Sequence, residues 1–248
     1  MKPCTPQHIL VVGATGATGL LLTQLLLELG HRVTVVVRSP EKLDHLSECK
    51  DQLRIVEASV TDLSLQEAQQ LLIGIDAIAS CLGHPSSLKG IFGKPRRLVR
   101  DTIHLLSAAS ISLHPPRPVK LILMNTSGNR NREAGERRSF IHLVLIGLIR
   151  LLLPPHADNE RAAEVLQKNI GQKHPSLSWV TVRPSWLIDQ EYVTPYDVFP
   201  SPTSDPIFQG GNTSRINVAH FMTHLITDQS LFQKWVGQMP VLYNQEQI

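Results

Sequence analysis

Close to its beginning the chain reads Gly13-Ala14-Thr15-Gly16-Ala17-Thr18-Gly19, with three glycines at intervals of three residues. Residues 9–12 before this turn are apolar and mostly β-branched, and residues 20–29 after it form an apolar stretch of helical composition. Residues 33–37 form a second β-rich run. A strand, a glycine turn, a helix and a strand within about thirty residues predict one βαβ unit.

The three glycines have separate physical roles in such a turn. Gly13 can adopt backbone angles that other residues avoid, so the strand can reverse sharply. Gly16 has no Cβ, so a pyrophosphate can approach the backbone, and Gly19 lets the helix pack close to the strand. A helix that starts near Gly16 also directs its free N–H groups and its positive dipole end at the phosphates. A turn kept only for packing would leave the regular spacing unexplained. We therefore predict a dinucleotide-binding turn, in which two threonines add hydroxyl donors, made by Gly13, Thr15, Gly16, Ala17, Thr18 and Gly19.

The residue that follows the second strand selects the cofactor. Folds that bind NAD place Asp or Glu there, because a carboxylate accepts a hydrogen bond from the ribose 2′-hydroxyl. This chain has Arg38, followed by Ser39, and a guanidinium instead makes charge-assisted hydrogen bonds to a 2′-phosphate. The sequence predicts NADP(H) rather than NAD(H), with Arg38 and Ser39 in the binding site. The alternative is an arginine that is merely solvated at a strand end.

The rest of the chain continues the alternation of strands and helices. Further strands are predicted over 52–57, 75–81, 119–124, 179–183 and 241–243, the last of them at the sheet edge. Helices are predicted over 40–49, 63–72, 96–112, 156–164 and beyond 214–220, and Asp158 or Asn159 would cap the fourth of these. The predicted fold class is α/β, a Rossmann-type doubly wound parallel sheet with helices on both faces. We expect one domain over 1–248, with residues 185–216 and an insertion over 139–155 forming the substrate side.

Composition limits the functions that the chain can have. Hydrophobic residues make up 42% of the chain, enough for a core, and the net charge of +3 is too small to predict nucleic-acid binding. Cys4, Cys49 and Cys81 are odd in number and far apart, so neither a disulfide framework nor a zinc site is expected. The N-terminus lacks the apolar core of a signal peptide. We expect a reduced, cytoplasmic protein.

In a doubly wound sheet, ligands bind at the carboxyl ends of the strands. Cys81 ends the fourth predicted strand and Leu82 and Gly83 follow it, and all three are expected near the nicotinamide-side ribose. Thr126 and Ser127 follow the fifth predicted strand at the same edge. The Cys81 side chain can be interpreted as a redox-sensitive thiol or as a small buried apolar group, and we favour the second interpretation.

The spacing G-x-x-G-x-x-G resembles that of the short-chain dehydrogenase/reductase superfamily. The whole chain resembles the atypical, NAD(P)H-binding NmrA-like group of that superfamily, with a closer likeness to flavin reductases and biliverdin-IXβ reductases. The segments that carry the likeness are 13–19, 37–39, 82–83, 126–127, 182–184, 214–215 and 219–222. Members of the closer group reduce flavins or bilins with NADPH in an open apolar pocket, which the resemblance implies here.

The resemblance also implies roles for individual residues. Ser59 and Val60 would lie beside the adenine, and Ser127 would hydrogen-bond the substrate carbonyl or the nicotinamide carboxamide. Asn159 and Trp186 stand where related proteins have histidines near the substrate. Asn159 is therefore grouped with Ser127 as catalytic, Trp186 is assigned to the substrate pocket, and the neighbouring Pro184 to the cofactor site.

The usual catalytic pair of the superfamily is absent. That pair is a tyrosine with a lysine four residues later, and the lysine lowers the pKa of the tyrosine so that it can act as an acid. Tyr192, Tyr196 and Tyr243 are the chain's only tyrosines, and none has lysine at that position. The ordinary alcohol-dehydrogenase mechanism is therefore not expected.

Three further features allow more than one interpretation. Residues 129–138 contain four arginines and are interpreted as a flexible loop in preference to a clamp for an anionic substrate. Residues 140–153 are nearly all apolar but too short to span a bilayer; in order of preference they form a buried helix, a lid over the substrate site or a membrane-surface contact. His220 and His224 have a metal-ligand spacing on a helix, but no third ligand accompanies them, so a packed helix face is favoured and no metal is predicted.

Two functions from different classes remain. The first is an NADPH-dependent reductase that delivers hydride to a flat conjugated small molecule, such as a flavin, quinone, enone or bilin. Its residues would supply placement and electrostatics, and water would supply the proton. The second is a non-catalytic NADP(H)-binding redox sensor or assembly factor of the NmrA-like type, which acts through a protein partner. The missing Tyr-Lys pair and the apolar segment 140–153 motivate the second function, and we favour the first.

Overall fold

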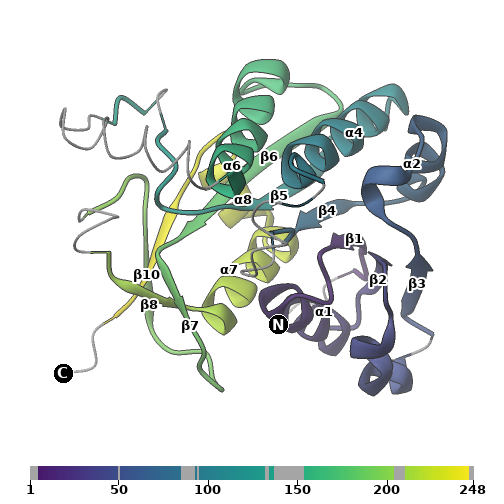
Figure 1. Cartoon of the computed structure of the whole chain (residues 1–248), viewed down its shortest axis with the longest axis horizontal. Helices are drawn as coiled ribbons and strands as arrows, with labels where there is room; N and C mark the ends of the chain where they lie inside the picture. Colours follow the sequence, from purple (N-terminus) through teal and green to yellow (C-terminus); the bar gives the residue numbers. More distant parts are fainter. Residues whose placement is uncertain are drawn as a thin grey trace.

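The structure is a computed structural model that describes residues 5–49, 51–84, 93, 95–131, 134–136, 154–203 and 210–245. Its centre is an eight-stranded sheet with the order β3-β2-β1-β4-β5-β6-β10-β8 (Figure 1). The strands are β1 (His8–Val12), β2 (Arg32–Val37), β3 (Leu53–Glu57), β4 (Ala77–Ser80), β5 (Val119–Met124), β6 (Leu177–Pro184), β8 (Tyr196–Phe199) and β10 (Val241–Asn244). All neighbouring strands are parallel except β8, which runs antiparallel to β10. The doubly wound α/β fold class is confirmed.

Helices cover both faces of this sheet (Figure 1). One face carries α1 (Ala17–Glu28), η1 (Glu41–Cys49), α7 (Arg215–Thr227) and α8 (Gln229–Trp235). The other face carries η2 (Val60–Asp62), α2 (Leu65–Leu72), α4 (Leu98–Ser112), α6 (Pro154–Glu164) and η3 (Val165–Ile170). The two layers bury two separate hydrophobic clusters, one on each side of the sheet.

Strand β1 shows why the sequence produces this arrangement. Ile9 and Val11 belong to the cluster beneath α1 and α7, whereas Leu10 and Val12 belong to the cluster beneath α2 and α4. Successive side chains of a strand point to opposite faces, so a central strand that is covered on both sides must be apolar throughout. All four side chains are fully buried.

Two predicted boundaries are wrong. The helix predicted to start near residue 156 begins at Pro154, so neither Asp158 nor Asn159 caps it; it also continues beyond Glu164 as the π-helix η3. The strand predicted over 241–243 at the sheet edge lies inside the sheet, between β6 and β8. The strand at this edge is β8. The sequence does not predict it, because residues 196–199 lie within the segment 185–216 that is assigned to the substrate side.

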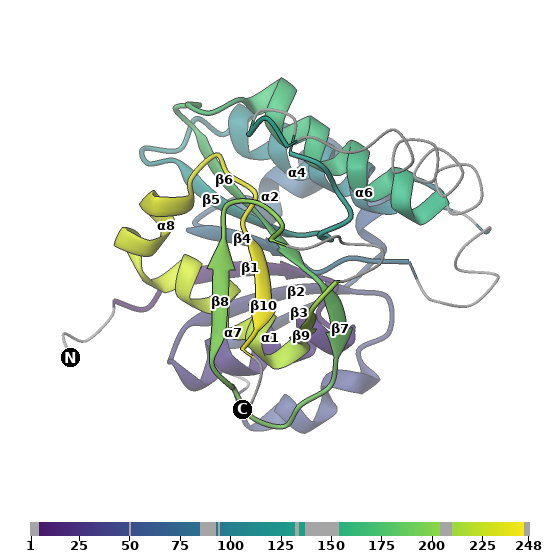
Figure 2. The same cartoon turned by 90° about the vertical axis from the view of Figure 1, so that its left-hand side faces the viewer.

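A second, two-stranded sheet lies beside β10 of the main sheet. β7 (Trp186–Ile188) pairs in parallel with β9 (Asn212–Ser214). Figure 2 shows β7, β8, β9 and β10 together on one side of the molecule. The apolar segment 140–153 lies outside the described residues. Among the helices that are described, none is long and apolar enough to cross a membrane.

Candidate functional site

The glycine turn lies where the strand order of the sheet reverses. β1 is hydrogen-bonded to β2 on one side and to β4 on the other, and the crossovers diverge from this point. The main-chain N–H of Cys81, just after β4, donates to the carbonyl of Val12 at the end of β1 at 2.9 Å. Ligands of doubly wound sheets bind in the crevice at this reversal, outside the carboxyl ends of the strands.

Two of the three glycines are required by a close contact or by their backbone conformation. Gly13 has a φ of +82°, and a Cβ there would lie 2.7 Å from the carbonyl carbon of Cys81. A Cβ on Gly19 would overlap the carbonyl oxygen of Gly13. A Cβ on Gly16 would meet only that same oxygen, at 3.2 Å. The turn therefore packs tightly against β4 and α1 and keeps an exposed backbone at Gly16.

The N-terminus of α1 fits a pyrophosphate. The helix begins at Ala17 with Gly16 as its N-cap, and no side chain caps it. Its first-turn N–H groups have no partner within the helix, and the positive end of the helix dipole lies at this end of α1, after the carboxyl end of β1. Thr15 is half-buried, and Thr18 is buried within the first turn. The residues present thus fit the phosphates of a dinucleotide.

The predicted adenine-side residues lie together at the ends of two neighbouring strands. Arg38 and Ser39 follow β2, and Ser59 and Val60 follow β3, which pairs with β2 in parallel. Arg38 is exposed, and it makes no ion pair with any carboxylate in the described part of the chain. The Ser59 hydroxyl lies 3.0 Å from that of Thr61, and Val60 is buried. A free guanidinium therefore stands where an NAD-selective site has a carboxylate.

Cys81 is partly buried, and it packs against the hydrophobic cluster beneath α1 and α7. Its Sγ lies 4.0 Å from the Sδ of Met222, and burial raises the pKa of Cys81 to about 12. A thiol that stays protonated is a poor nucleophile and is slow to oxidise, so this environment agrees with the apolar interpretation. Leu82 and Gly83 continue from Cys81 along the crevice, with Gly83 exposed.

The ends of β5 and β6 and the helix α6 meet at the same edge. The N–H of Ser127 donates to the carbonyl of Pro184 at 2.9 Å, and the Asn125 side chain donates to the main-chain carbonyl of Asn159 at 2.9 Å. Ser127 is 2% exposed, and its hydroxyl makes no hydrogen bond to another residue within the described ranges. The Thr126 hydroxyl accepts from the N–H of Gly128 at 3.3 Å. The structure therefore places Asn159 beside the strand end that carries Thr126 and Ser127.

A buried Asp–His pair was not recognised from the sequence. The carboxylate of Asp158, on α6, accepts from the main-chain N–H groups of Val99 and Arg100 at 2.8 and 3.1 Å, and it lies 2.8 Å from the Nε2 of His84. The side chains of His84 and Asp158 are 5% and 1% exposed. Asp158 thus caps α4, across the interface between two helices, and fixes the residue that follows Gly83.

One signal in the sequence indicates such a contact. The cap position of α4 is Arg97, and no side chain of its own segment bonds to its first turn. Ser, Thr, Asp and Asn are the usual residues at this position. A buried helix that lacks a local cap needs an acceptor from elsewhere in the chain.

Arg183 organises the loop that follows Ser127. This fully buried side chain on β6 donates to the carbonyls of Met239 and Asn129 at 2.6 and 2.7 Å. It also forms an ion pair with Glu136 at 2.7 Å. The described parts of the predicted flexible loop 129–138 are therefore anchored to β6, while Arg132, Arg137 and Arg138 fall outside the described residues.

Trp186 lies on β7, at the outer side of this edge. Trp186 is 53% exposed, and its main-chain N–H donates to the carbonyl of Gly211 at 3.2 Å. An indole held on a strand with its ring largely accessible can stack on a flat ligand. The structure thus presents Trp186 on a regular element near the C-terminal ends of β5 and β6.

The two histidines with metal-ligand spacing contact each other and a tyrosine. The Nε2 atoms of His220 and His224 are 3.1 Å apart, and the Nδ1 of His220 lies 2.9 Å from the hydroxyl of Tyr196. Burial, and then the proximity of His224, lower the pKa of His220. Across the described ranges, no group of three or more His, Cys, Asp or Glu side chains could hold a metal ion.

Comparison with known proteins gives the family. The sequence profile of the NAD(P)H-binding family matches residues 13–229, and the chain belongs to this family. Membership gives it a nicotinamide dinucleotide as its cofactor, in agreement with the crevice described above. A search of curated protein sequences finds no significant match.

Solved structures support the fold assignment. The chain is similar to a protein from Bacillus halodurans classed with NAD-dependent epimerases and dehydratases (21% identity, 97% of this chain and 95% of that chain, TM-score 0.68). It is similar to ChuY, an anaerobillin reductase from Escherichia coli O157:H7 (18% identity, 98% and 99%, TM-score 0.66). It is also similar to a short-chain dehydrogenase/reductase from Veillonella parvula in complex with NADP (16% identity, 97% and 95%, TM-score 0.61). These likenesses show a Rossmann-type fold.

Proposed function

We propose that this protein is an NADPH-dependent oxidoreductase that transfers hydride to a flat conjugated acceptor such as a flavin, quinone, enone or bilin. The observation that carries the proposal is the convergence, on one sheet edge, of an open phosphate-binding turn, an unpaired Arg38, a buried Ser127 and an exposed Trp186. When bound, the reduced nicotinamide supplies the hydride, and a proton from solvent completes the reduction of the acceptor.

NADPH is the proposed reductant because of the charge at the end of β2. Arg38 is exposed and has no carboxylate partner in the described chain, so its guanidinium is free to bind a 2′-phosphate. The neighbouring Ser39 is also exposed and can add a hydroxyl. A related fold solved with NADP is consistent with this preference.

The remaining cofactor contacts are assigned by position along the crevice. Ser59 and Val60 would line the adenine side. Cys81, Leu82, Gly83, Thr126 and Pro184 would line the nicotinamide side, since they follow or end β4, β5 and β6. Main-chain groups and small side chains dominate this second set, as expected where a planar ring must lie flat against the protein.

Ser127 is the proposed orienting group for the reaction. Its main chain is fixed to Pro184, and its hydroxyl has no partner in the described chain, so it can donate to a carboxamide or to an acceptor carbonyl. Asn159 would support this position from α6, through the bond between its carbonyl and Asn125. Trp186 would stack on the acceptor, with residues 185–216, which include β7, β8 and β9, forming the substrate side.

Solvent is the proposed proton source because the tyrosines are poorly suited to the task. Burial raises the pKa of Tyr196 to about 12, far from the neutral range in which a general acid is most effective. Tyr196 is in addition committed to His220. Tyr192 is 76% exposed and lies in the segment between β7 and β8, so most of this residue faces solvent, whereas a general acid must be held against the substrate.

The test is NADPH oxidation, followed near 340 nm (about that wavelength for the reduced nicotinamide), with FMN, a quinone and a bilin as acceptors. An anaerobillin reductase shares this fold, which supports including a bilin. Turnover of at least one acceptor is expected, with a loss of about tenfold or more in Ser127→Ala. Ser112→Ala, at the exposed end of α4, is the matched control and should keep wild-type turnover.

A redox sensor or regulatory protein is the second candidate. The absence of a Tyr-x-x-x-Lys pair favours it, because such a protein needs NADP(H) binding without proton transfer. Tight NADPH binding with no turnover of any of the three acceptors would refute the reductase and support the sensor. Failure to bind either NADPH or NADH would refute both.

A further inference from the structure

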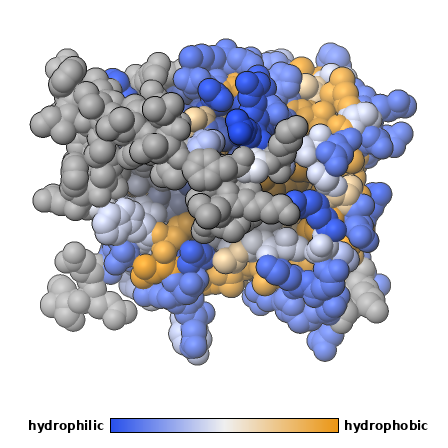
Figure 3. All heavy atoms as spheres, in the orientation of Figure 1, coloured by the Kyte–Doolittle hydropathy of each residue, from blue (hydrophilic) through white to orange (hydrophobic). Residues whose placement is uncertain are grey.

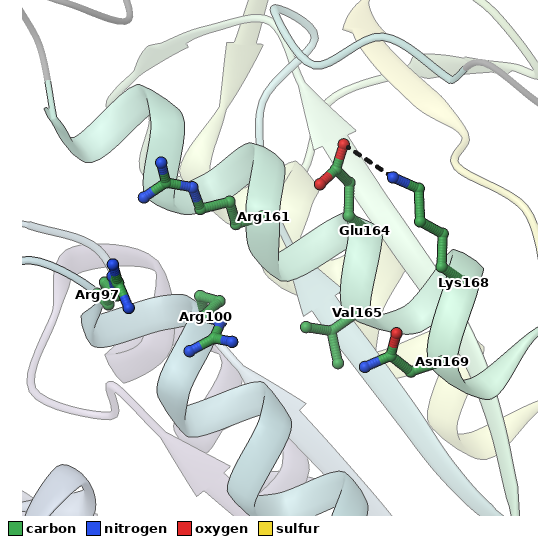
Figure 4. A pocket seen from close by; sticks show the side chains of 7 residues that line it. All are labelled: Arg97, Arg100, Arg161, Glu164, Val165, Lys168 and Asn169. Carbon is green, nitrogen blue, oxygen red and sulfur yellow. Dashed lines mark ion pairs between the residues drawn. The ribbon is translucent and has the colours of Figure 1, made fainter.

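A cavity of about 410 Å³ opens between α4 and the α6–η3 helix, and its lining is strongly cationic. Figure 4 shows Arg97 at the N-cap of α4 and Arg100 in its first turn, with Arg161 across the groove on α6 and Lys168 further along η3. Glu164 is the single acidic residue of the lining. The lining alone thus carries a formal charge of +3, as much as the whole 248-residue chain. Strongly hydrophilic side chains also gather over α6 on this face (Figure 3).

Two of the four cations are not neutralised within the described chain. Lys168 forms an ion pair with Glu164 at 3.5 Å, and Arg100 pairs with Asp101 at 2.7 Å. Arg97 and Arg161 are exposed, and within the described ranges neither makes a side-chain hydrogen bond or ion pair. Two unpaired guanidinium groups, one at the start of α4 and one on α6, therefore border one cavity, and guanidinium groups bind carboxylates and phosphates through paired hydrogen bonds.

The backbone of the groove is unusual as well. After Glu164 the helix changes from α to π, and Val165–Ile170 form η3. The residues Val165, Lys168 and Asn169 of this π-helix line the cavity. π-helical turns are rare and are frequent at functional sites. The wider turn displaces the later lining residues from where a regular α-helix would place them.

This groove is separate from the nucleotide crevice. On α6 the residues Asp158, Ala162 and Ala163 are buried against the protein, whereas Arg161 is exposed on the outer surface. The crevice lies at the strand ends on the buried side of α6, where the Asn159 carbonyl meets Asn125. None of the groove residues belongs to the proposed cofactor or acceptor site.

We propose that the groove between α4 and η3 binds a small polyanion bearing phosphate or carboxylate groups, as a second ligand site. Its volume is within the usual range for small-ligand pockets, about 300–1,000 Å³. Arg97 and Arg161 would each bind one oxyanion group from opposite walls. Val165, which is 7% exposed, would form the apolar floor. The size of the cavity favours a small molecule over an extended nucleic acid or an acidic peptide.

The test is calorimetric titration of sodium pyrophosphate, and separately of citrate, into the protein in the presence of saturating NADPH, so that the nucleotide crevice is filled. At least one probe should bind with salt-sensitive affinity. Arg97→Ala and Arg161→Ala should each weaken that binding by about tenfold or more. Arg117→Ala, an exposed arginine in the turn before β5, is the control and should bind as the wild type does. Because both groove arginines are exposed and neither forms a side-chain hydrogen bond or ion pair with the described residues, both variants should keep the wild-type melting temperature.

The two probes separate the two sources of oxyanion groups. Binding of pyrophosphate alone would identify a phosphate-bearing ligand, and binding of citrate alone a polycarboxylate. Absence of binding by both probes would overturn the proposal, as would equal binding by wild type, Arg97→Ala and Arg161→Ala. Tight binding of a single-stranded oligonucleotide with no binding of either small probe would overturn it in favour of a nucleic-acid surface.

Discussion

The Asp158 carboxylate offers the sharpest test of how the site is held together. Asp158→Ala removes two hydrogen bonds to the first turn of α4 and the partner of His84, in surroundings where Val99 is fully buried. Losing a helix cap costs about 1 kcal/mol, and leaving a buried N–H unsatisfied costs about 1–3 kcal/mol. We expect the free energy of unfolding to fall by about 3 kcal/mol, within the range of a broken buried network.

The assay is urea unfolding followed by circular dichroism, with thermal unfolding in parallel. For a chain of this size, about 2–4 °C per kcal/mol predicts a melting temperature lower by roughly 6–12 °C. Asp158→Asn keeps one acceptor oxygen for the N–H of Val99 but turns an N–H₂ group toward the N–H of Arg100. Its free energy of unfolding should therefore fall by about half as much as that of Asp158→Ala. In a double-mutant cycle, His84→Ala should cost less in the Asp158→Ala background than in the wild type.

The control lies on the capped helix itself. Asp101 is also in the first turn of α4, but it forms an ion pair with Arg100 in which the two side chains are 48% and 37% exposed. Asp101→Ala should therefore cost no more than about 0.5 kcal/mol. If Asp158→Ala and Asp101→Ala destabilise the protein equally, or if Asp158→Ala costs under about 1 kcal/mol, the inter-helix cap has no structural importance and this reasoning is wrong.

Further predictions concern the cofactor, the glycine turn and pH. Arg38→Ala should weaken NADPH binding by about tenfold or more and leave NADH binding nearly unchanged; equal effects on both nucleotides, measured by fluorescence titration, would contradict the role of Arg38. Gly13→Ala should abolish nucleotide binding, because its Cβ would strike the Cys81 backbone. Gly30→Ala, with a similar φ of +80° but nothing within 4 Å of its Cβ, should only lose stability. Burial lowers the pKa of His31 from 6.5, so the unfolded chain takes up the proton first and stability should decrease as the pH falls below 6.5. In a His31→Asn variant, the free energy of unfolding, measured by urea unfolding at several pH values, should decrease less steeply as the pH falls. An unchanged pH dependence would contradict the role given to His31.

The glycine turn could be predicted because its signal is local. The three glycines, the strand before them and the helix after them all lie within one short stretch, and the structure gives Gly13 a positive φ and Gly19 a close approach to the backbone of Gly13, as predicted. Helix positions were also predicted well from apolar spacing. Their ends were not, because α6 is extended by the prolines at its start and by a π-helix at its end.

Contacts between distant segments could not be predicted. Asp158 was recognised as a capping residue, but the helix that it caps starts 60 positions earlier in the chain, at Leu98. The insertion of β10 between β6 and β8 depends on pairings that no single segment encodes. Arg183 reads as a charged strand end in the sequence, and its burial becomes explicable only when Glu136 and the carbonyls of Asn129 and Met239 surround it.

The place of β10 in the sheet also determines an order of assembly. β8 is joined to the sheet only through β10, and β10 joins β6 through two paired positions, Val241 with Arg183 and Leu242 with Pro184. β8 therefore cannot join the sheet before β10, which starts more than 25 residues further along the chain than β9, has docked. Such late, non-local pairings close slowly and open at low free energy. Amide hydrogen exchange should consequently be fastest in the part of the sheet that we propose to face the acceptor, so this wall can adapt to molecules of different outline while the nucleotide-binding half stays rigid.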